Sequence, residues 1–314
     1  MENHSLIRID QRMSTVERRK DLNMSIRILD AKVWTPTDLK EAWALRERFR
    51  LQSSFVAGGT WLQTQWEKGM PYPSHLISLE NIAELEGVDQ RKVNGKQCLY
   101  IGALTKLDTC GHHPAIQKLC PLLSVAIQQI AAPAVRNLGT IGGNVAHGLG
   151  DAIPALLTMD AEVLFFDGRI LKSEKLEHWL KGRKRNQESL LTGIILPESQ
   201  HSSFSNQFFK KVGRREAFSG SVVTVSGVIS KNEAGVIDFA RLVAGGGENT
   251  PKRLQETEQL LIDQKINFLL LKNVYKTILH EFHPNSDVFY SNDYRRRVTA
   301  NIIVSELSRL GEAS

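Results

Sequence analysis

Apolar residues along this chain of 314 residues recur in two kinds of pattern. Short runs rich in β-branched and aromatic residues, as at 55–57 and 99–102, predict strands. Apolar residues three or four positions apart at 38–50 and 119–130 predict helices. Strand, turn and helix patterns alternate, which predicts an α+β domain over residues 25–200.

A short strand-like segment at 31–37 precedes the first helical pattern, and Thr37 is expected to cap that helix. Before this segment, residues 1–24 are polar and charged, and their periodicity is weak. We expect them to form a disordered N-terminal extension, with Met24 as an alternative to Met1 for the true start.

A polar, turn-forming stretch at 197–206 marks the end of the first domain. Beyond it, β-branched runs at 222–229 and 239–244 predict strands. Helical patterns follow at 256–261, 268–282 and 294–310. These elements predict a small α+β domain over residues 205–312, with a three-stranded sheet and three helices. We interpret the three glycines at 245–247 as a structural turn rather than a phosphate loop.

The composition is that of an ordinary globular protein, with a net charge of +6 and a charged fraction of 24%. No apolar run reaches the roughly 18 residues that a membrane span needs, so no membrane partner is expected. The basic residues are scattered and are not interleaved with aromatic residues, which argues against nucleic acid. A basic surface also suits a dinucleotide or an acidic partner subunit.

The three cysteines, Cys98, Cys110 and Cys120, are widely spaced. This spacing argues against a disulfide framework and predicts a reducing, cytoplasmic location. An iron–sulfur cluster needs grouped thiolates, and the chain has no Cys-x-x-Cys, so any such cluster is expected on another polypeptide. We interpret the adjacent His112 and His113 as loop residues rather than metal ligands.

Two glycine turns carry the most specific functional signal. The first is Val-Ala-Gly-Gly-Thr at 56–60, and the second is Thr-Ile-Gly-Gly-Asn at 140–144. Glycine accepts a positive φ and lets backbone N–H groups approach an anion closely. Two such turns brought together would hold the two phosphates of a pyrophosphate without a helix dipole. The chain has neither the Gly-x-Gly-x-x-Gly motif of a Rossmann domain nor the Gly-x-x-x-x-Gly-Lys-Ser/Thr motif of a P-loop. The sequence therefore supports neither of these nucleotide-binding structures.

The order and spacing of the two turns resemble those of the FAD-binding subunits of molybdenum hydroxylases, the xanthine dehydrogenase and carbon monoxide dehydrogenase group. The resemblance extends over residues 25–310. Further segments that carry it lie at 100–105, 154–157, 194–197 and 293–296. It implies a two-part FAD-binding domain of the PCMH (vanillyl-alcohol oxidase-like) type, followed by a CO dehydrogenase flavoprotein-like C-terminal domain.

The resemblance further implies that FAD is bound non-covalently by both turns. The first turn would contribute Ala57, Gly58, Gly59, Thr60, Trp61 and Leu62, with Trp61 where the family usually has an acidic residue. The second turn would contribute Thr140, Gly142, Gly143 and Asn144. Here the threonine hydroxyl would bind a phosphate oxygen and the glycines would expose their N–H groups. The asparagine amide would bind phosphate or orient the turn.

Asp151, Leu191 and Lys210 complete the FAD-binding set that the resemblance implies. Asp151 is expected to bind the ribose hydroxyls, with a helix cap as the alternative. Leu191 and Lys210 would touch the flavin or adenine side of FAD, with core and surface positions as the alternatives. Arg214 and Arg215 match an arginine pair near the flavin, and a solvated basic turn is the alternative.

The reaction and the assembly also follow from the resemblance. The chain would be the electron-transfer subunit of a molybdenum hydroxylase, xanthine dehydrogenase in the first interpretation, with no catalytic side chain and no metal ligand of its own. A small 2Fe–2S subunit and a large molybdopterin subunit would be its partners in a dimer of heterotrimers, and NAD⁺ would be the acceptor. The alternatives are a stand-alone flavin oxidase or reductase of the same superfamily, and the FAD subunit of a hydroxylase for CO, an aldehyde or an N-heterocycle.

Overall fold

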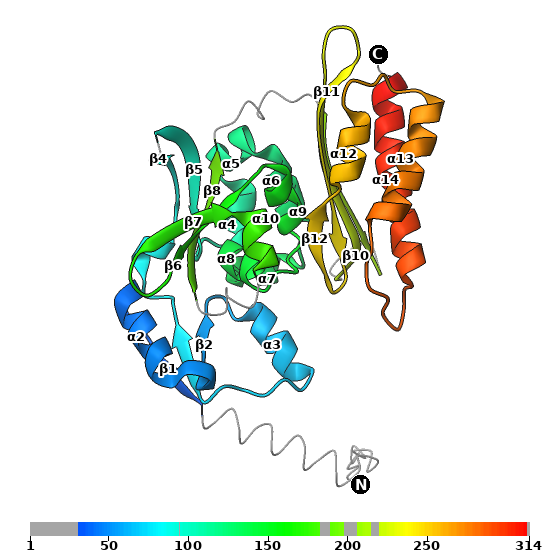
Figure 1. The fold of residues 1–314 in the computed structure, drawn as a ribbon. Helices are drawn as coiled ribbons and strands as arrows, with labels where there is room; N and C mark the ends of the chain where they lie inside the picture. The colour runs from blue at the N-terminus through cyan, green and yellow to red at the C-terminus, as the bar shows by residue number, and fades with distance from the viewer. Residues whose placement is uncertain (1–30, 94, 183–188, 198–205, 215–219, 313–314) are drawn as a thin grey trace, which may run out of the picture.

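The computed structural model describes residues 31–93, 95–182, 189–197, 206–214 and 220–312. The predicted extension at 1–24 lies outside these residues. Three β-sheets and the helices between and around them make up the described part of the chain (Figure 1). Their order along the chain gives an N-terminal unit, a central unit and a C-terminal unit.

The N-terminal unit is a parallel three-stranded sheet with strand order β1-β3-β2. Its strands are β1 (Lys32–Trp34), β2 (Ser53–Val56) and β3 (His75–Ser78). Helix α2 (Leu39–Phe49) joins β1 to β2, and helix α3 (Thr60–Glu67) follows β2. Parallel neighbours need such crossovers, which is why helices alternate with the strands here.

The cap of α2 is Asp38, whose side chain accepts a hydrogen bond from the Glu41 N–H at 2.8 Å. The prediction that Thr37 caps this helix is therefore wrong by one residue. The N–H of Thr37 instead donates to Oε2 of Glu41 at 2.9 Å. Threonine and aspartate are both good N-caps, and Thr37 and Asp38 are adjacent. The sequence alone therefore did not determine at which residue the helix begins.

The central unit is a five-stranded sheet with order β4-β5-β8-β6-β7, in which all neighbours are antiparallel. Its strands are β4 (Val88–Val93), β5 (Lys96–Gly102), β6 (Glu162–Phe166), β7 (Leu171–Lys175) and β8 (Leu190–Pro197).

Short helices pack around the central sheet, and α6 and α9 separate it from the C-terminal sheet (Figure 1). They are α4 (Leu107–His112), α5 (Pro114–Leu119), α6 (Pro121–Gln128), α7 (Pro133–Leu138), α8 (Ile141–Ala146), α9 (Ile153–Thr158) and α10 (Leu176–Lys181). The helix predicted at 119–130 is shorter than expected. Cys120 has non-helical backbone angles, and Pro121 occupies the first turn of α6.

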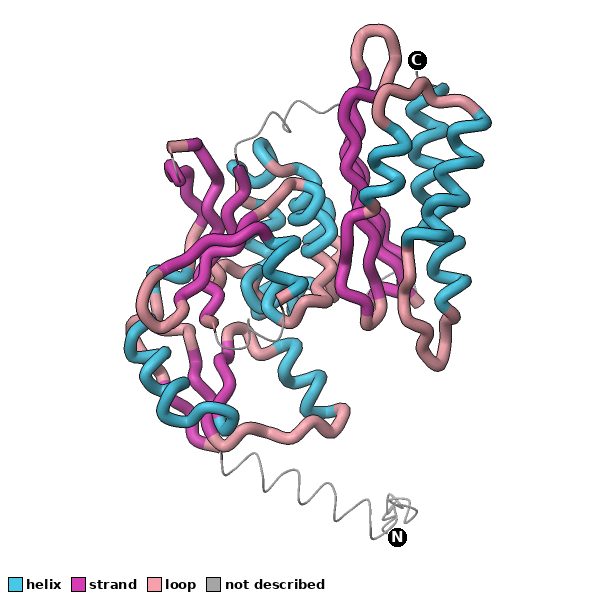
Figure 2. The backbone as a smooth tube through the Cα atoms, viewed as in Figure 1, coloured by secondary structure: helices cyan, strands magenta, loops and turns pink. Residues whose placement is uncertain are grey.

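The C-terminal unit is an antiparallel sheet with order β12-β11-β10-β9. Three long strands, β9 (Asn206–Gly213), β10 (Ser221–Lys231) and β11 (Ile237–Gly246), form most of it, and the short β12 (Asn249–Arg253) adds a fourth at the edge. Helices α12 (Gln255–Leu261), α13 (Phe268–Glu281) and α14 (Asn292–Glu312) lie on the face away from the first domain (Figure 2).

Of the three glycines at 245–247, Gly245 and Gly246 end β11 and Gly247 begins the turn to β12, so the segment is structural, as interpreted from the sequence. Gly246 has a φ of 113° and Gly247 a φ of 63°, values that side chains of other residues disfavour. The N–H of Gly247 donates to the carbonyl of Ser221 at 2.7 Å, so this N–H is already used within the protein.

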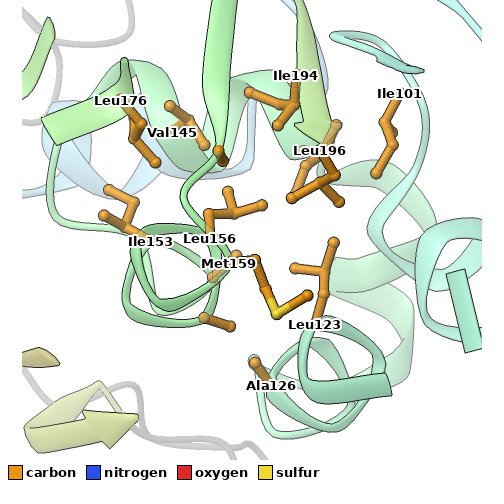
Figure 3. Packing of buried hydrophobic residues seen from close by; sticks show 14 of the residues in the cluster. Ile101, Leu123, Ala126, Val145, Ile153, Leu156, Met159, Leu176, Ile194 and Leu196 are labelled. Carbon is orange, nitrogen blue, oxygen red and sulfur yellow. The ribbon is translucent and has the colours of Figure 1, made fainter. Parts of the chain in front are cut away.

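One hydrophobic core joins the central unit to the C-terminal unit. Figure 3 shows Leu156 and Met159 facing Leu123 of α6 and Leu196 of β8. Residues of the C-terminal sheet, including Phe209, belong to the same buried cluster. Each fully buried large apolar side chain contributes about 1.5–3 kcal/mol, so this shared core fixes the C-terminal sheet against α6 and α9.

Candidate functional site

The first glycine turn connects β2 directly to α3. Gly59 is the N-cap of α3 and has a φ of 70°, in the left-handed region that glycine tolerates. The backbone N–H groups of residues 59–62 have no acceptor among the residues that the structure describes. They form the positive end of a helix of eight residues, so this turn does use a helix N-terminus, contrary to the expectation.

The second glycine turn is built differently. The Thr140 hydroxyl caps α8 by accepting the Gly143 N–H at 3.0 Å, and the Gly142 N–H donates to the Ala103 carbonyl at 2.9 Å. The expectation that both glycines expose free N–H groups is therefore wrong. Thr140 is only 2% exposed, so its hydroxyl serves the helix rather than an open surface. A Cβ at Gly142 would lie 2.6 Å from the Cβ of Ala103, which explains why glycine is needed there.

The two turns meet in space. A Cβ added at Gly58 would lie 2.0 Å from the carbonyl oxygen of Leu138 and 3.0 Å from the Cα of Gly139. A Cβ added at Gly139 would lie 3.4 Å from Oγ1 of Thr60. Gly58 thus lets the backbone before α3 approach the backbone before α8 more closely than any other residue type would permit, and a Cβ at Gly139 would make ordinary contact with Thr60.

A third segment, 103–107, supports this junction from the central sheet. The Ile141 N–H donates to the Thr105 carbonyl at 3.0 Å, and the Leu107 N–H donates to the Gly139 carbonyl at 2.9 Å. Nζ of Lys106 reaches the Leu138 carbonyl at 3.4 Å, the same oxygen against which Gly58 packs.

Lys106 therefore places a cation at the junction of the two turns. Its ammonium has no carboxylate within ion-pair distance in the described part of the chain. The sequence reasoning missed this residue, although it directly follows the family-like segment at 100–105. An unpaired cation beside free N–H groups is a suitable environment for an anion.

An aromatic pair spans the same two segments. The rings of Trp61 and His147 are stacked, with centroids 4.2 Å apart and an interplanar angle of 12°. Trp61 belongs to the first turn of α3, and His147 is the C-cap of α8. The sequence interpretation treated His147 as a loop residue and missed this contact, because nothing in the local pattern pairs the two rings.

Asn144 orients the loop after α8, the second of its two expected roles. Its Oδ1 accepts the Ala152 N–H at 3.1 Å, and a Cβ at Gly150 would lie 2.1 Å from that oxygen. Asp151 lies in this loop and pairs with Nζ of Lys211 at 2.8 Å. Their side chains are 14% and 10% exposed, so the pair is largely shielded from water.

Of the two roles expected for Asp151, ribose binding and a helix cap, the structure excludes the helix cap. Helix α9 has Ala152 as N-cap and no side-chain cap, so Asp151 does not cap it. The ion pair with Lys211 links the loop after α8 to β9 of the C-terminal sheet. The carboxylate keeps further lone pairs, and ribose binding by Asp151 stays a proposal.

The other two expected FAD-binding residues have contacts within the protein. Leu191 lies in β8, is 7% exposed and belongs to the hydrophobic core. Lys210 pairs with Glu306 of α14 at 3.4 Å, so it faces the outer helices. Its neighbour Lys211 faces the first domain instead, since successive strand residues alternate between the two faces. The lysine that contacts the loop after α8 is therefore Lys211 and not Lys210.

The expected arginine pair is described only in part. The guanidinium of Arg214 lies over the ring of Phe289 at 3.7 Å, within the C-terminal domain. Arg215 lies outside the described residues. No group of three or more histidine, cysteine, aspartate or glutamate residues that could hold a metal ion occurs among those described. None of the described helices is long and apolar enough to cross a membrane.

The fold is that of an α+β protein in which two glycine turns meet, and comparison with known families gives its class. The FAD binding domain in molybdopterin dehydrogenase matches residues 25–199. The CO dehydrogenase flavoprotein C-terminal domain matches residues 207–310. The chain belongs to the family of FAD-binding subunits of molybdenum hydroxylases.

Several curated relatives are similar over most of the chain. The nicotinate dehydrogenase FAD-subunit of Eubacterium barkeri is 26% identical, over 90% of this chain and 97% of the relative. The xanthine dehydrogenase FAD-binding subunit of Escherichia coli O157:H7 is 24% identical, over 78% of this chain and 84% of the relative. Among solved structures, carbon monoxide dehydrogenase from Hydrogenophaga pseudoflava has a TM-score of 0.80 at 22% identity, covering 88% of this chain and 96% of that chain. This last likeness concerns the fold.

Proposed function

We propose that this chain binds FAD at the junction of its two glycine turns and serves as the electron-transfer subunit of a molybdenum hydroxylase. The observation that carries the proposal is the contact of Gly58 with the Leu138 carbonyl, beside the free N–H groups of 59–62 and the ammonium of Lys106. These donors fit a pyrophosphate, because they combine a helix N-terminus with a cation and close backbone approach.

Different residues of the junction would bind the cofactor and hold the two turns in position. The N–H groups of 59–62 would donate to phosphate oxygens, and Lys106 would neutralise part of their charge. The Thr140 cap and its bonds to the 103–107 segment would keep the second turn rigid. The Trp61–His147 stack would fix the start of α3 against the end of α8.

Asp151 would accept hydrogen bonds from the ribose hydroxyls while it remains paired with Lys211. In that arrangement the C-terminal sheet would hold the ribose-binding loop in place. FAD, when bound, supplies the two-electron redox chemistry that links the molybdenum reaction to the final acceptor, and the protein supplies its position and electrostatics.

Partners and acceptor are also part of the proposal. Relatives named medium chain, medium subunit or FAD-subunit support an assembly with a small 2Fe–2S subunit and a large molybdopterin subunit. We propose a dimer of such heterotrimers, with NAD⁺ as acceptor. Xanthine is the first substrate to test, and nicotinate is the second because a nicotinate dehydrogenase FAD-subunit is similar over 90% of this chain.

The visible spectrum of the purified full-length chain tests the cofactor. Bound flavin, or uptake of one FAD per chain by the apo-protein, is the expected result. A colourless chain that cannot be reconstituted with FAD would refute the proposal.

Anaerobic mixing with NADH, and separately with xanthine or nicotinate, tests the direction of electron flow. NADH is expected to bleach the flavin, whereas the heterocycles should do so only after the two partner subunits are added. Bleaching by a heterocycle without partners would favour a stand-alone oxidase. Bleaching by no reagent would leave FAD binding intact and remove NAD⁺ from the mechanism.

A further inference from the structure

The outer face of the C-terminal domain carries an apolar groove that lies apart from the glycine turns. Helix α13 buries one stripe, Leu270, Val274 and Ile278, in the core of this domain. A second stripe on the same helix lines the groove, together with Val304 of α14. Its members are Phe268, Leu271, Tyr275 and Leu279. The groove is open to solvent and has a volume of about 550 Å³, and Phe268, one of its lining residues, is 82% exposed.

The edge of this groove is positively charged. Lys272 and Lys276 line it, and they lie one helical turn apart on α13. Both residues are exposed, and neither has a carboxylate partner in the part of the chain that the structure describes. The groove therefore combines an apolar floor with two unneutralised cations at a fixed spacing.

We propose that this groove binds an amphipathic helix of a partner polypeptide that carries two acidic residues four positions apart. The stripe on α13 recurs at positions i, i+3, i+7 and i+11, the spacing with which one helix packs its apolar face along another. Acidic residues at i and i+4 of the incoming helix would match Lys272 and Lys276. The inference rests on the C-terminal domain alone and does not depend on FAD binding.

The charges distinguish this occupant from a second copy of the chain. A two-fold contact through the same face would bring Lys272 and Lys276 close to the equivalent lysines, which opposes association. An anionic membrane would also satisfy the lysines, and competition by anionic vesicles distinguishes it from a partner helix.

The test uses the full-length chain and two fluorescent helical peptides of about 18 residues, long enough to form several turns. Both peptides carry the same apolar stripe, and they differ only in having glutamates or lysines at the two flanking positions. Binding is followed by fluorescence anisotropy. The glutamate peptide should bind on the order of tenfold more tightly than the lysine peptide, because two exposed ion pairs replace two repulsions.

A charge exchange supplies the decisive control. In the double variant Lys272→Glu and Lys276→Glu, the preference should reverse toward the lysine peptide. The matched variant Lys40→Glu and Lys118→Glu, with the same change in net charge on exposed residues of the first domain, should keep the original preference. Phe268→Asp changes a residue that is 82% exposed, so the chain should fold while both peptides bind more weakly.

Three results would overturn the proposal. The first is equal binding of the two peptides, or no binding of either. The second is self-association of the wild-type chain in sedimentation that the Lys272→Glu and Lys276→Glu variant abolishes, which would assign the groove to a second copy. The third is displacement of the glutamate peptide by vesicles of phosphatidylglycerol but not of phosphatidylcholine, which would assign the groove to an anionic membrane.

Discussion

Replacing Gly58 by alanine tests the contact between the two turns directly. The new Cβ would lie 2.0 Å from the Leu138 oxygen and 2.7 Å from its carbonyl carbon. Both are backbone atoms held by the bonds between 103–107 and 139–142, so they cannot move aside by a side-chain rotation. The variant must therefore separate the turn before α3 from the turn before α8.

This forced separation of the two turns should lower both the stability of the protein and its affinity for FAD. Inserting a methyl group into a packed site destabilises a protein by about 1–3 kcal/mol, and we expect Gly58→Ala to lower the unfolding free energy of the apo-protein by this amount. The free N–H groups of 59–62 would also move away from the second turn and Lys106. A loss of about 1.4 kcal/mol in binding is a tenfold loss of affinity, so FAD should bind at least about tenfold more weakly.

Gly59→Ala is the matched control. Gly59 has a φ of 70°, but a Cβ there would meet only Cγ1 of Val56, at 3.9 Å. The left-handed conformation destabilises alanine at this position by about 1–2 kcal/mol, but the added Cβ does not push the two turns apart. It should therefore lower stability by a similar amount and weaken FAD binding less than Gly58→Ala does.

The assay combines calorimetric titration of the apo-proteins with FAD and urea unfolding without FAD. The contrast between the two glycines decides the outcome. Wild-type FAD affinity in a folded Gly58→Ala variant would show that the junction of the turns is not the cofactor site. An unchanged unfolding free energy would show that the close packing at Leu138 does not occur in solution.

Lys106→Met should weaken FAD binding by about tenfold and make it less sensitive to salt, whereas Lys106→Arg should preserve both, as titrations at low and high salt would reveal. Lys211→Met leaves Asp151 without its partner, so the unfolding free energy should fall by about 3 kcal/mol; an unchanged urea midpoint would refute the pairing. Burial raises the pKa of the Cys110 and Cys120 thiols to about 12, from an ordinary value of 9.0. Since the folded state favours the protonated thiols, the unfolding free energy should fall as pH rises above about 9, and both thiols should resist a thiol reagent until urea unfolds the chain.

Several features of this protein were accessible from the sequence because they are local. The period of apolar residues located α12, α13 and α14 to within a few residues of their observed bounds. The glycines at 245–247 were interpreted as a structural turn because they follow a predicted strand and precede residues 248–251, and Gly246 and Gly247 have the positive φ that glycine tolerates. The two glycine turns likewise indicated a dinucleotide site, since that signal lies within a few consecutive residues.

Other features depended on contacts between distant segments. Only the fold shows that the N–H groups of Gly142 and Gly143 are used within the protein while those of 59–62 are free. A donor's availability depends on which acceptor the rest of the chain brings near it, and the sequence does not encode that locally. The same holds for Lys106, whose place at the junction follows from the bonds that join 103–107 to 139–142.

The two adjacent lysines of β9 give the clearest case. Lys210 and Lys211 have the same chemistry, and the sequence cannot tell which one faces the first domain. Successive strand residues point to opposite faces, and a register shift of one residue would exchange them. The pairing of β9 with β10, together with the helices on one side and the first domain on the other, sends Lys210 to Glu306 and Lys211 to Asp151. The residue types were set by the sequence, and their assignment to the two faces came from the packing of the sheet.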